Sequence, residues 1–339
     1  MSQRRRCHAF HIAAWVIAGF CGFWLWSGYF DHPAESTVIP LKVTAAPIAL
    51  NKIAPAAAPG KVLDLDAAKS HVGKHVSVVS LPIPIGKPQW LRNAVAVGPA
   101  NGRPQIAIII DDAGVNRRNT EKAIALEAPL TISFLPYAHG LKPMVSRARA
   151  NGHEIMVHLP MEPLGGEENP GPHALWVDET NTEILRRLDW NLDRFGGYVG
   201  VNNHMGSRFS ADRPAMRVVL DELHRRGLLF IDSRTTSRTV GAKVAEAVGM
   251  PWAERDVFLD NSEDPAAIRV QLQTLEHIAR IRGQAVAIGH PYDSTIQVLR
   301  DWLPTAHSRG FEMVPVSRIV EDKLHQERLM AVAAEDVRP

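Results

Sequence analysis

Two adjacent carboxylates, Asp111 and Asp112, follow a short apolar run that reads Gln105-Ile-Ala-Ile-Ile-Ile. A run this short, closed by aspartates and Gly114, is typical of a parallel-sheet strand buried on both faces. Catalytic groups in such sheets lie at the carboxyl ends of the strands. Because successive strand side chains point to opposite faces, the two aspartates are predicted to have different roles unless the chain bends there. A helix N-cap is the alternative, although a cap needs only one aspartate.

Polar side chains also follow other predicted strands. The predicted strands cover residues 106–110, 130–135, 154–159, 198–202, 228–232, 256–259, 285–289 and 312–316. The polar groups in or after them are His158 and Glu162, Asn203 and His204, Asp232, Asp260, and His290. In a parallel barrel the carboxyl ends of the strands share one mouth. Residues far apart in the sequence are therefore predicted to converge on one pocket.

Each of these groups also has an ordinary structural explanation. His158 could be a core histidine, and residues 203–207 could form only a turn. Asp232 could cap a helix, Asp260 could lie in a loop, and His290 could mark the end of a strand. Their common position after strands favours a single site over separate explanations.

The composition limits the classes of function. The chain has 339 residues, 45% hydrophobic content and a formal net charge of +2. It can therefore bury a large core, and it offers no extended basic surface for nucleic acid. Both cysteines, Cys7 and Cys21, lie in the N-terminal stretch, which excludes a cysteine nucleophile and cysteine-ligated zinc in the folded part. Absence of a Gly-x-Ser-x-Gly motif argues against a serine hydrolase.

The N-terminal third predicts an anchor and a linker. Residues 9–30 contain no Asp, Glu, Lys or Arg, and a transmembrane helix needs about 20 apolar residues. Because Arg4, Arg5 and Arg6 precede this stretch, the positive-inside rule places the N-terminus in the cytoplasm and the remainder in the periplasm, across a bacterial inner membrane. A cleaved signal peptide is the alternative. The proline-rich residues 32–100 predict an extended linker whose end, around Trp90, docks on the next domain.

The remaining sequence alternates strands with amphipathic helices. Helices are predicted at residues 179–195 and 213–226, and a third begins at Asp264-Pro265. This alternation predicts an α/β fold with a parallel sheet, and about eight strands in roughly 220 residues favour a barrel. The predicted domains are a cytoplasmic tip and anchor at 1–31, the linker at 32–100, the barrel at 101–325 and a tail at 326–339.

Five motifs resemble those of the divergent polysaccharide deacetylase family, a distant branch of the NodB-type carbohydrate esterases. They are Ile110-Asp-Asp-Ala-Gly114, the segment 152–163, Asn202-Asn-His-Met-Gly-Ser207, Asp232-Ser-Arg-Thr235 and Ile288-Gly-His-Pro291. The resemblance covers about residues 104–322. It implies a distorted (β/α) barrel of the NodB type, with a divalent metal held by one aspartate and two histidines. It also implies that Asp111 is the general base, Asp112 a metal ligand, His158 the first metal histidine and His290 the acid.

The sequence departs from the classical family pattern at Glu162, where a second histidine is expected. We expect His204 to replace that histidine, with Glu162 as a further ligand or a supporting group. Asp232 is grouped with the catalytic residues because it could orient His290 or Arg234. The other predicted supporting residues are Asn203, Ser207, Arg234 and Asp260.

This set of residues can perform hydrolysis. One carboxylate and two imidazoles leave open positions on a zinc ion, which lowers the pKa of a bound water to about 7 and polarises an acyl oxygen. Asp111 would accept a proton and His290 would protonate the leaving group. The predicted function is a membrane-anchored, periplasmic, zinc-dependent hydrolase that removes acetyl or other acyl groups from an envelope or secreted polysaccharide. The alternatives are a non-catalytic glycan-binding module and hydrolysis of another ester at the same metal.

Overall fold

The computed structural model describes residues 86–98, 101–166 and 168–336. The predicted membrane segment and most of the predicted linker lie outside these residues. Within them, none of the helices combines the length and the apolar character that crossing a bilayer requires. The membrane anchor therefore stays a prediction.

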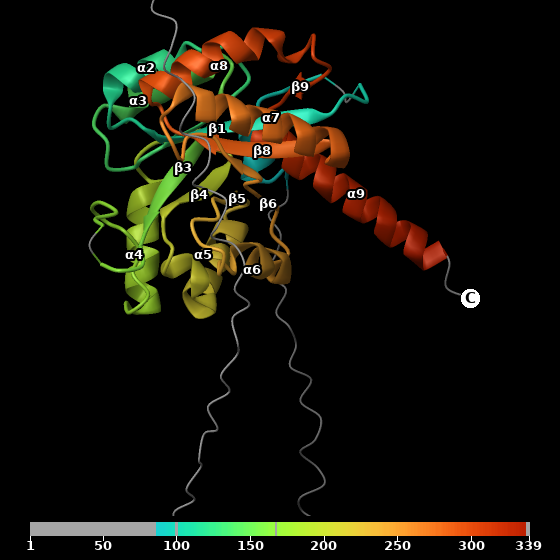
Figure 1. Cartoon of the computed structure of the whole chain (residues 1–339). Coiled ribbons are helices and arrows are strands. Elements are labelled where there is room, and N and C mark those ends of the chain that lie inside the picture. The colour runs from blue at the N-terminus through green and yellow to red at the C-terminus, as the bar shows by residue number, and fades with distance from the viewer. Residues whose placement is uncertain (1–85, 99–100, 167, 337–339) are drawn as a thin grey trace, which may run out of the picture. The chain divides into compact units, whose positions relative to one another are not determined.

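In the described part of the chain, nine parallel strands form one sheet, in the order β6-β5-β4-β3-β2-β1-β8-β7, with β9 paired to β1 (Figure 1). The strands are β1 (Gln105–Ala113), β2 (Thr131–Phe134), β3 (Glu154–Met161), β4 (Gly200–Met205), β5 (Leu229–Asp232), β6 (Trp252–Glu254), β7 (Val257–Phe258), β8 (Gln284–Gly289) and β9 (Glu312–Met313). Only Arg255 and Asp256 separate the two end strands, β6 and β7, so the ends of the strand order lie close together. The parallel sheet is thus curled into a half-barrel, in agreement with the predicted fold class.

Helices connect most of these strands. They are α1 (Gln89–Asn93), α2 (Arg117–Ile124), α3 (Leu141–Ala150), α4 (Asn181–Leu192), α5 (Arg213–Arg225), α6 (Gly241–Val248), α7 (Pro265–Arg282), α8 (Asp293–Ala306) and α9 (Val316–Asp336), with a 3₁₀ turn at Phe209–Ala211. The side chains of Thr180, Asp212 and Asp264 cap α4, α5 and α7. These caps satisfy backbone N–H groups at the first turn, which is why the three predicted helices begin at these positions.

Strand β1 alternates between two apolar clusters. Ala107 and Ile109 belong to one cluster, together with Trp90 of α1 and the beginning of α9. We call this side of the sheet the inner face. The alternate residues Ile106, Ile108 and Ile110 pack under the other helices, on the opposite face. Burial of both faces confirms the prediction from the apolar run, and the packing of Trp90 confirms that the end of the predicted linker docks on the domain. A period of two places the next inner-face position of β1 at Asp111.

The turn after β1 requires a glycine at position 114. Gly114 has φ +107°, and an added Cβ would lie 2.8 Å from the Cβ of Ala138. Gly310 also has a positive φ, +90°, but nothing lies within 4 Å of its added Cβ. We expect Gly114→Ala to lower the free energy of unfolding by roughly 2 to 5 kcal/mol through backbone strain and overpacking, against about 1 to 2 kcal/mol of strain for Gly310→Ala. Urea unfolding measures both; equal losses would contradict the role of the Ala138 contact.

Candidate metal centre

Three polar side chains from strands β1, β3 and β4 meet at one point. Nδ1 of His204 lies 2.9 Å from Oδ1 of Asp112 and 3.1 Å from Nε2 of His158. Nε2 of His158 lies 3.3 Å from the same Asp112 oxygen. The ligand atoms of the three residues all lie within 4.8 Å of one another. The structure therefore brings together the three residues that the sequence predicts as metal ligands.

Asp112 reaches the inner face because β1 bends at this residue. Its φ is +54°, and the pairing of β1 with β2 shifts register between Ile110 and Ala113. A positive φ is uncommon outside glycine and costs about 1 to 2 kcal/mol. The bend turns Asp112 to the same side as Asp111, so the expectation of opposite faces does not hold here. Neither aspartate is the N-cap of α2, which is Asn116.

Strand periodicity explains the placement of the two histidines that follow apolar inner-face residues. Met156 of β3 and Ile288 of β8 belong to the inner-face cluster. His158 and His290 follow them by two residues, so their side chains fall on the same face. His158 contacts a side-chain amide rather than a backbone carbonyl, so the core-histidine alternative does not describe it.

Burial and neighbouring charges set the protonation of the three ligands. Burial opposes the charge of Asp112, but contacts with His158 and His204 outweigh it and hold its pKa far below the usual range. Burial lowers the pKa of His204, and the adjacent His158 lowers it further against the pull of Asp112. Burial also opposes a charge on His158, but Asp111 and Asp112 outweigh it and raise the pKa of that imidazole. An ionised carboxylate and a neutral imidazole are the forms that bind divalent cations. The lowered pKa values of Asp112 and His204 favour these forms, whereas a cation that binds His158 would displace its proton.

Asp111 and His290 flank the three ligands. Oδ2 of Asp111 lies 3.6 Å from Nε2 of His158, and Nε2 of His290 lies 3.9 Å from Oδ2 of Asp112. Burial raises the pKa of Asp111, which is 2% exposed. A raised carboxyl pKa suits a group that accepts a proton near neutral pH.

Asp260 holds His290. Oδ1 of Asp260 accepts a hydrogen bond from Nδ1 of His290 at 3.0 Å, and its Oδ2 accepts from the His290 backbone N–H at 2.5 Å and from Oγ1 of Thr295 at 2.8 Å. Burial opposes a charge on His290, but the bond to Asp260 and the nearby carboxylates raise its pKa to about 9. The protonated imidazole is therefore the form present at neutral pH, with Nε2 directed towards the ligands.

Asp232 lies outside this group. It follows Phe230, which packs under the helices, by two residues and therefore points away from the inner face. Its carboxylate accepts hydrogen bonds from the backbone N–H of Arg234 at 2.9 Å and from Oγ1 of Thr239 at 2.7 Å. The sequence predicts that Asp232 orients His290 or Arg234. In the structure Asp232 contacts Arg234, whereas His290 is oriented by Asp260. The contact with Arg234 fits the capping-turn alternative for Asp232.

Glu162 is tied to a neighbouring loop. Its Oε2 accepts a hydrogen bond from the backbone N–H of Val177 at 2.8 Å, and its Oε1 forms an ion pair with Arg208. Arg208 also pairs with Asp178 at 2.9 Å. The Glu162 carboxylate thus holds the segments after β3 and β4 together, and it is not in the group of three ligand atoms.

Three other predicted supporting residues hold loops around the site. Oδ1 of Asn203 accepts a hydrogen bond from the backbone N–H of Ser233 at 2.9 Å. Oγ of Ser207 accepts from the backbone N–H of Leu164 at 2.8 Å. Arg234 pairs with Glu254 at 3.1 Å. Their contacts are with strand ends and loops, so they shape the mouth of the half-barrel rather than join the ligand group.

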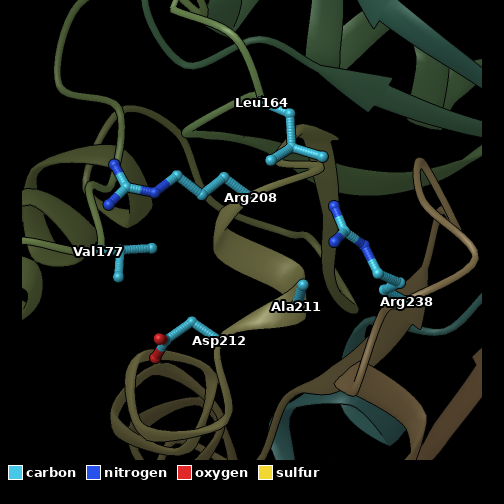
Figure 2. A pocket seen from close by; sticks show the side chains of 6 residues that line it. All are labelled: Leu164, Val177, Arg208, Ala211, Asp212 and Arg238. Atoms are coloured by element: carbon cyan, nitrogen blue, oxygen red, sulfur yellow. The ribbon is translucent and has the colours of Figure 1, made fainter. Parts of the chain in front are cut away.

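A pocket of about 360 Å³ lies beside the Glu162–Arg208 ion pair. It is lined by Leu164, Val177, Arg208, Ala211, Asp212 and Arg238 (Figure 2). In Figure 2 the guanidinium of Arg208 lies on the Val177 side of the pocket, and that of Arg238 lies on the Leu164 side. None of the three candidate metal ligands lines it. The pocket and the candidate metal centre are therefore separate features.

Sequence reasoning missed one residue at the centre of the site. Asn202 is fully buried and pairs with His158 across β3 and β4. Its position two residues before His204 on the same strand is the signal that could have identified it, because residues i and i+2 of a strand share a face.

Comparison with known proteins places the whole site inside one family region. A family model described as divergent polysaccharide deacetylase matches residues 108–320. The uncharacterized protein YibQ of Escherichia coli K12 is 34% identical over 196 residues, which are 58% of this chain and 61% of that protein. An uncharacterized protein of Haemophilus influenzae is 31% identical over 198 residues, 58% of this chain and 70% of that protein. The match thus spans about three fifths of the length of the first of these relatives.

A solved structure shows the same fold. The crystal structure of uncharacterized protein ATU2773 from Agrobacterium tumefaciens C58 aligns with a TM-score of 0.67 and 32% sequence identity. The alignment covers 68% of this chain and 95% of that one. The described domain therefore corresponds to almost the whole of that structure.

Proposed function

Since this chain belongs to the divergent polysaccharide deacetylase family, we propose that it is a metal-dependent hydrolase that removes acetyl or other acyl groups from a polysaccharide. The observation that supports the proposal best is the meeting of Asp112, His158 and His204 at one point. Asp111 and His290 lie on the flanks of this group. A carboxylate and an imidazole so placed can serve as the base and the acid of hydrolysis, respectively.

The three ligands fit a zinc ion. Two imidazole nitrogens and a carboxylate oxygen crowd together within hydrogen-bond distance, and such a set of lone pairs is best satisfied by a cation. Three protein ligands are also the number that a catalytic zinc site uses. When bound, zinc would supply Lewis-acid activation of water and of the acyl oxygen.

The flanking residues would move the protons. Asp111 would accept a proton from the attacking water, which adds its oxygen to the acyl carbon. His290 would donate a proton from Nε2 to the leaving nitrogen or oxygen as its bond to the acyl carbon breaks. Asp260 keeps the His290 ring oriented for that transfer, because it accepts the hydrogen bond from Nδ1. The products are a carboxylic acid and a free amine or hydroxyl on the sugar.

The proposed location is the periplasmic side of a bacterial inner membrane. Its support is the uncharged stretch at residues 9–30, preceded by Arg4, Arg5 and Arg6, which by the positive-inside rule would direct the following domain outward. An envelope or secreted polysaccharide is the substrate class that an enzyme in that location would meet.

Release of acetate from an acetylated polysaccharide tests the function. The full-length protein, loaded with zinc, is expected to release acetate from at least one acetylated envelope polysaccharide, and removal of the metal by a chelator is expected to stop release. Glycan binding without acetate release would instead support the binding-module alternative. A wild-type protein that binds no divalent metal would end the proposal.

The rate of acyl release is expected to fall as pH rises through about 9. His290 acts as an acid only when protonated, and its pKa is raised to about 9 from 6.5; the active form is therefore present below that pH and lost above it. Asp260→Asn removes the charge that holds the proton, so the falling limb should move to lower pH, towards 6.5. The dependence of kcat/KM on pH measures the shift.

Asp256→Asn is the control for this profile. Asp256 pairs with Arg282 at 2.8 Å and accepts the backbone N–H of Val286 at 2.8 Å, away from His290. In Asp256→Asn, kcat/KM should fall with rising pH at the same pH as in the wild type. An Asp260→Asn profile that coincides with the wild type would contradict the assigned acid.

A further inference from the structure

We propose that Asn202 is a positioning residue that couples Asp111 to His158 through one side-chain amide. Asn202 has 0% exposure, and its Cα pairs with that of His158 in the register between β3 and β4. Neighbouring residues on paired strands present their side chains to the same face. Its amide therefore lies between the proposed base and one of the proposed metal ligands.

The amide makes a hydrogen bond in every direction that it can. Its Nδ2 donates to both carboxylate oxygens of Asp111, at 2.8 Å and 3.0 Å, and to Oγ of Ser233 at 3.2 Å. Its Oδ1 accepts from Oγ of Ser133 at 2.5 Å and lies 3.1 Å from Nδ1 of His158. Among the described residues, Asn202 is the group that donates hydrogen bonds to the Asp111 carboxylate. A buried carboxylate so held has little freedom to turn.

These contacts determine the orientation of the amide. A carboxylate only accepts hydrogen bonds, so Nδ2 must face Asp111. The amide oxygen then faces His158, and because an amide oxygen also only accepts, Nδ1 of His158 must carry a proton. When the His158 ring is neutral, as it must be to bind a metal, its lone pair is therefore on Nε2, the atom that faces Asp112 and His204.

One side chain thus sets two features of the site. Its oxygen selects the His158 tautomer that can bind a metal through Nε2, as hydrogen-bond partners behind metal-ligating histidines do. Its nitrogen holds the Asp111 carboxylate near that ligand. The second of these roles rests on the proposed function, whereas the first concerns metal binding alone.

Two substitutions separate the two roles. Asn202→Asp keeps an oxygen towards His158 and replaces the donor facing Asp111 by a second carboxylate, which repels it. Asn202→Leu removes both contacts at similar volume. Zinc affinity is measured by competition with a chelating dye, and kcat and KM by acetate release, on full-length proteins shown by circular dichroism to be folded.

Asn191→Leu is the matched control. Asn191 is also a fully buried asparagine, and its amide donates to the backbone carbonyls of His173 and Arg187 in and near α4. Loss of this amide should reduce stability without changing zinc affinity or kcat. The control distinguishes positioning of the site from a general cost of removing a buried amide.

We expect Asn202→Leu to lose zinc affinity by about 10- to 100-fold, and Asn202→Asp to bind zinc no more weakly than the wild type. We expect kcat to fall about 100-fold or more in both when zinc is saturating, with KM nearly unchanged. Unchanged zinc affinity in Asn202→Leu, or an equal loss in Asn202→Asp, would overturn the role towards His158. Wild-type kcat in Asn202→Asp would overturn the role towards Asp111. If the wild type binds zinc but releases no acetate, the proposed function fails, and the affinities of the two variants still decide the first role.

Discussion

His204→Ala is expected to lose tight zinc binding and, with it, all measurable acyl release. His204 contributes one of three ligand atoms, and its Nδ1 lies 2.9 Å from Asp112 and 3.1 Å from His158. Loss of a residue that only supports a ligand costs about 10- to 100-fold in metal affinity. Loss of a ligand itself should therefore cost more than about 100-fold. Isothermal titration of the metal-free protein with zinc measures the effect.

Two variants sharpen this experiment. Glu162 occupies the position where the classical family pattern has its second histidine, but its carboxylate binds Arg208 and the backbone of Val177. Glu162→Gln should therefore retain zinc. His153→Gln is the matched control for His204→Ala and should retain zinc. His153 is also a buried histidine near β3, but its Nδ1 accepts a hydrogen bond from the backbone N–H of Leu130 at 3.2 Å. Zinc loss in Glu162→Gln, with retention in His204→Ala, would reverse the assignment of the third ligand.

Asp111→Asn is expected to lower kcat by about 100- to 10,000-fold, the usual contribution of a general base. The variant keeps the size of the side chain and removes its ability to accept a proton. Zinc affinity should change little, because the ligand atoms belong to Asp112, His158 and His204. Single-turnover rates of acetate release at saturating zinc provide the measurement.

The same variant distinguishes the enzyme from the glycan-binding alternative. If the domain only recognises glycans, Asp111→Asn should bind them as the wild type does, and neither protein should release acetate. If the domain is an acyl hydrolase, the two proteins should bind glycan alike and differ in acetate release. A kcat within about threefold of the wild type would mean that another group takes the proton.

Most strands of the described domain, and the helices α4, α5 and α7, could be predicted from local patterns. Each helix cap, at Thr180, Asp212 or Asp264, lies next to the first residue of the helix that it begins. Each apolar run likewise covers the strand that it predicts, so both signals are local in the sequence. Each predicted strand overlaps an observed one. Strand β6 is not predicted because its three residues, Trp252–Glu254, are too few to show a period. The predictions for residues 1–85 lie outside the described part of the chain.

The choice between Asp232 and Asp260 required the structure. Both follow predicted strands, and either could orient a histidine. Phe230 packs under the helices, so Asp232 falls on that side; Phe258 packs against the inner-face cluster, so Asp260 falls with His290. A strand buried on both faces is apolar throughout, so its sequence does not show which face is inner.

The sequence by itself determined which strand ends carry carboxylates and imidazoles, because strand periodicity and the carboxyl-end rule are local properties of a parallel sheet. The tertiary structure alone decided that Asp112 turns inward at φ +54°, that Glu162 stays outside the group of ligand atoms, and that Asn202 lies between Asp111 and His158. The reason is physical: a bend at a bulge and a hydrogen bond between strands depend on register and packing, which residues far apart in the chain set together.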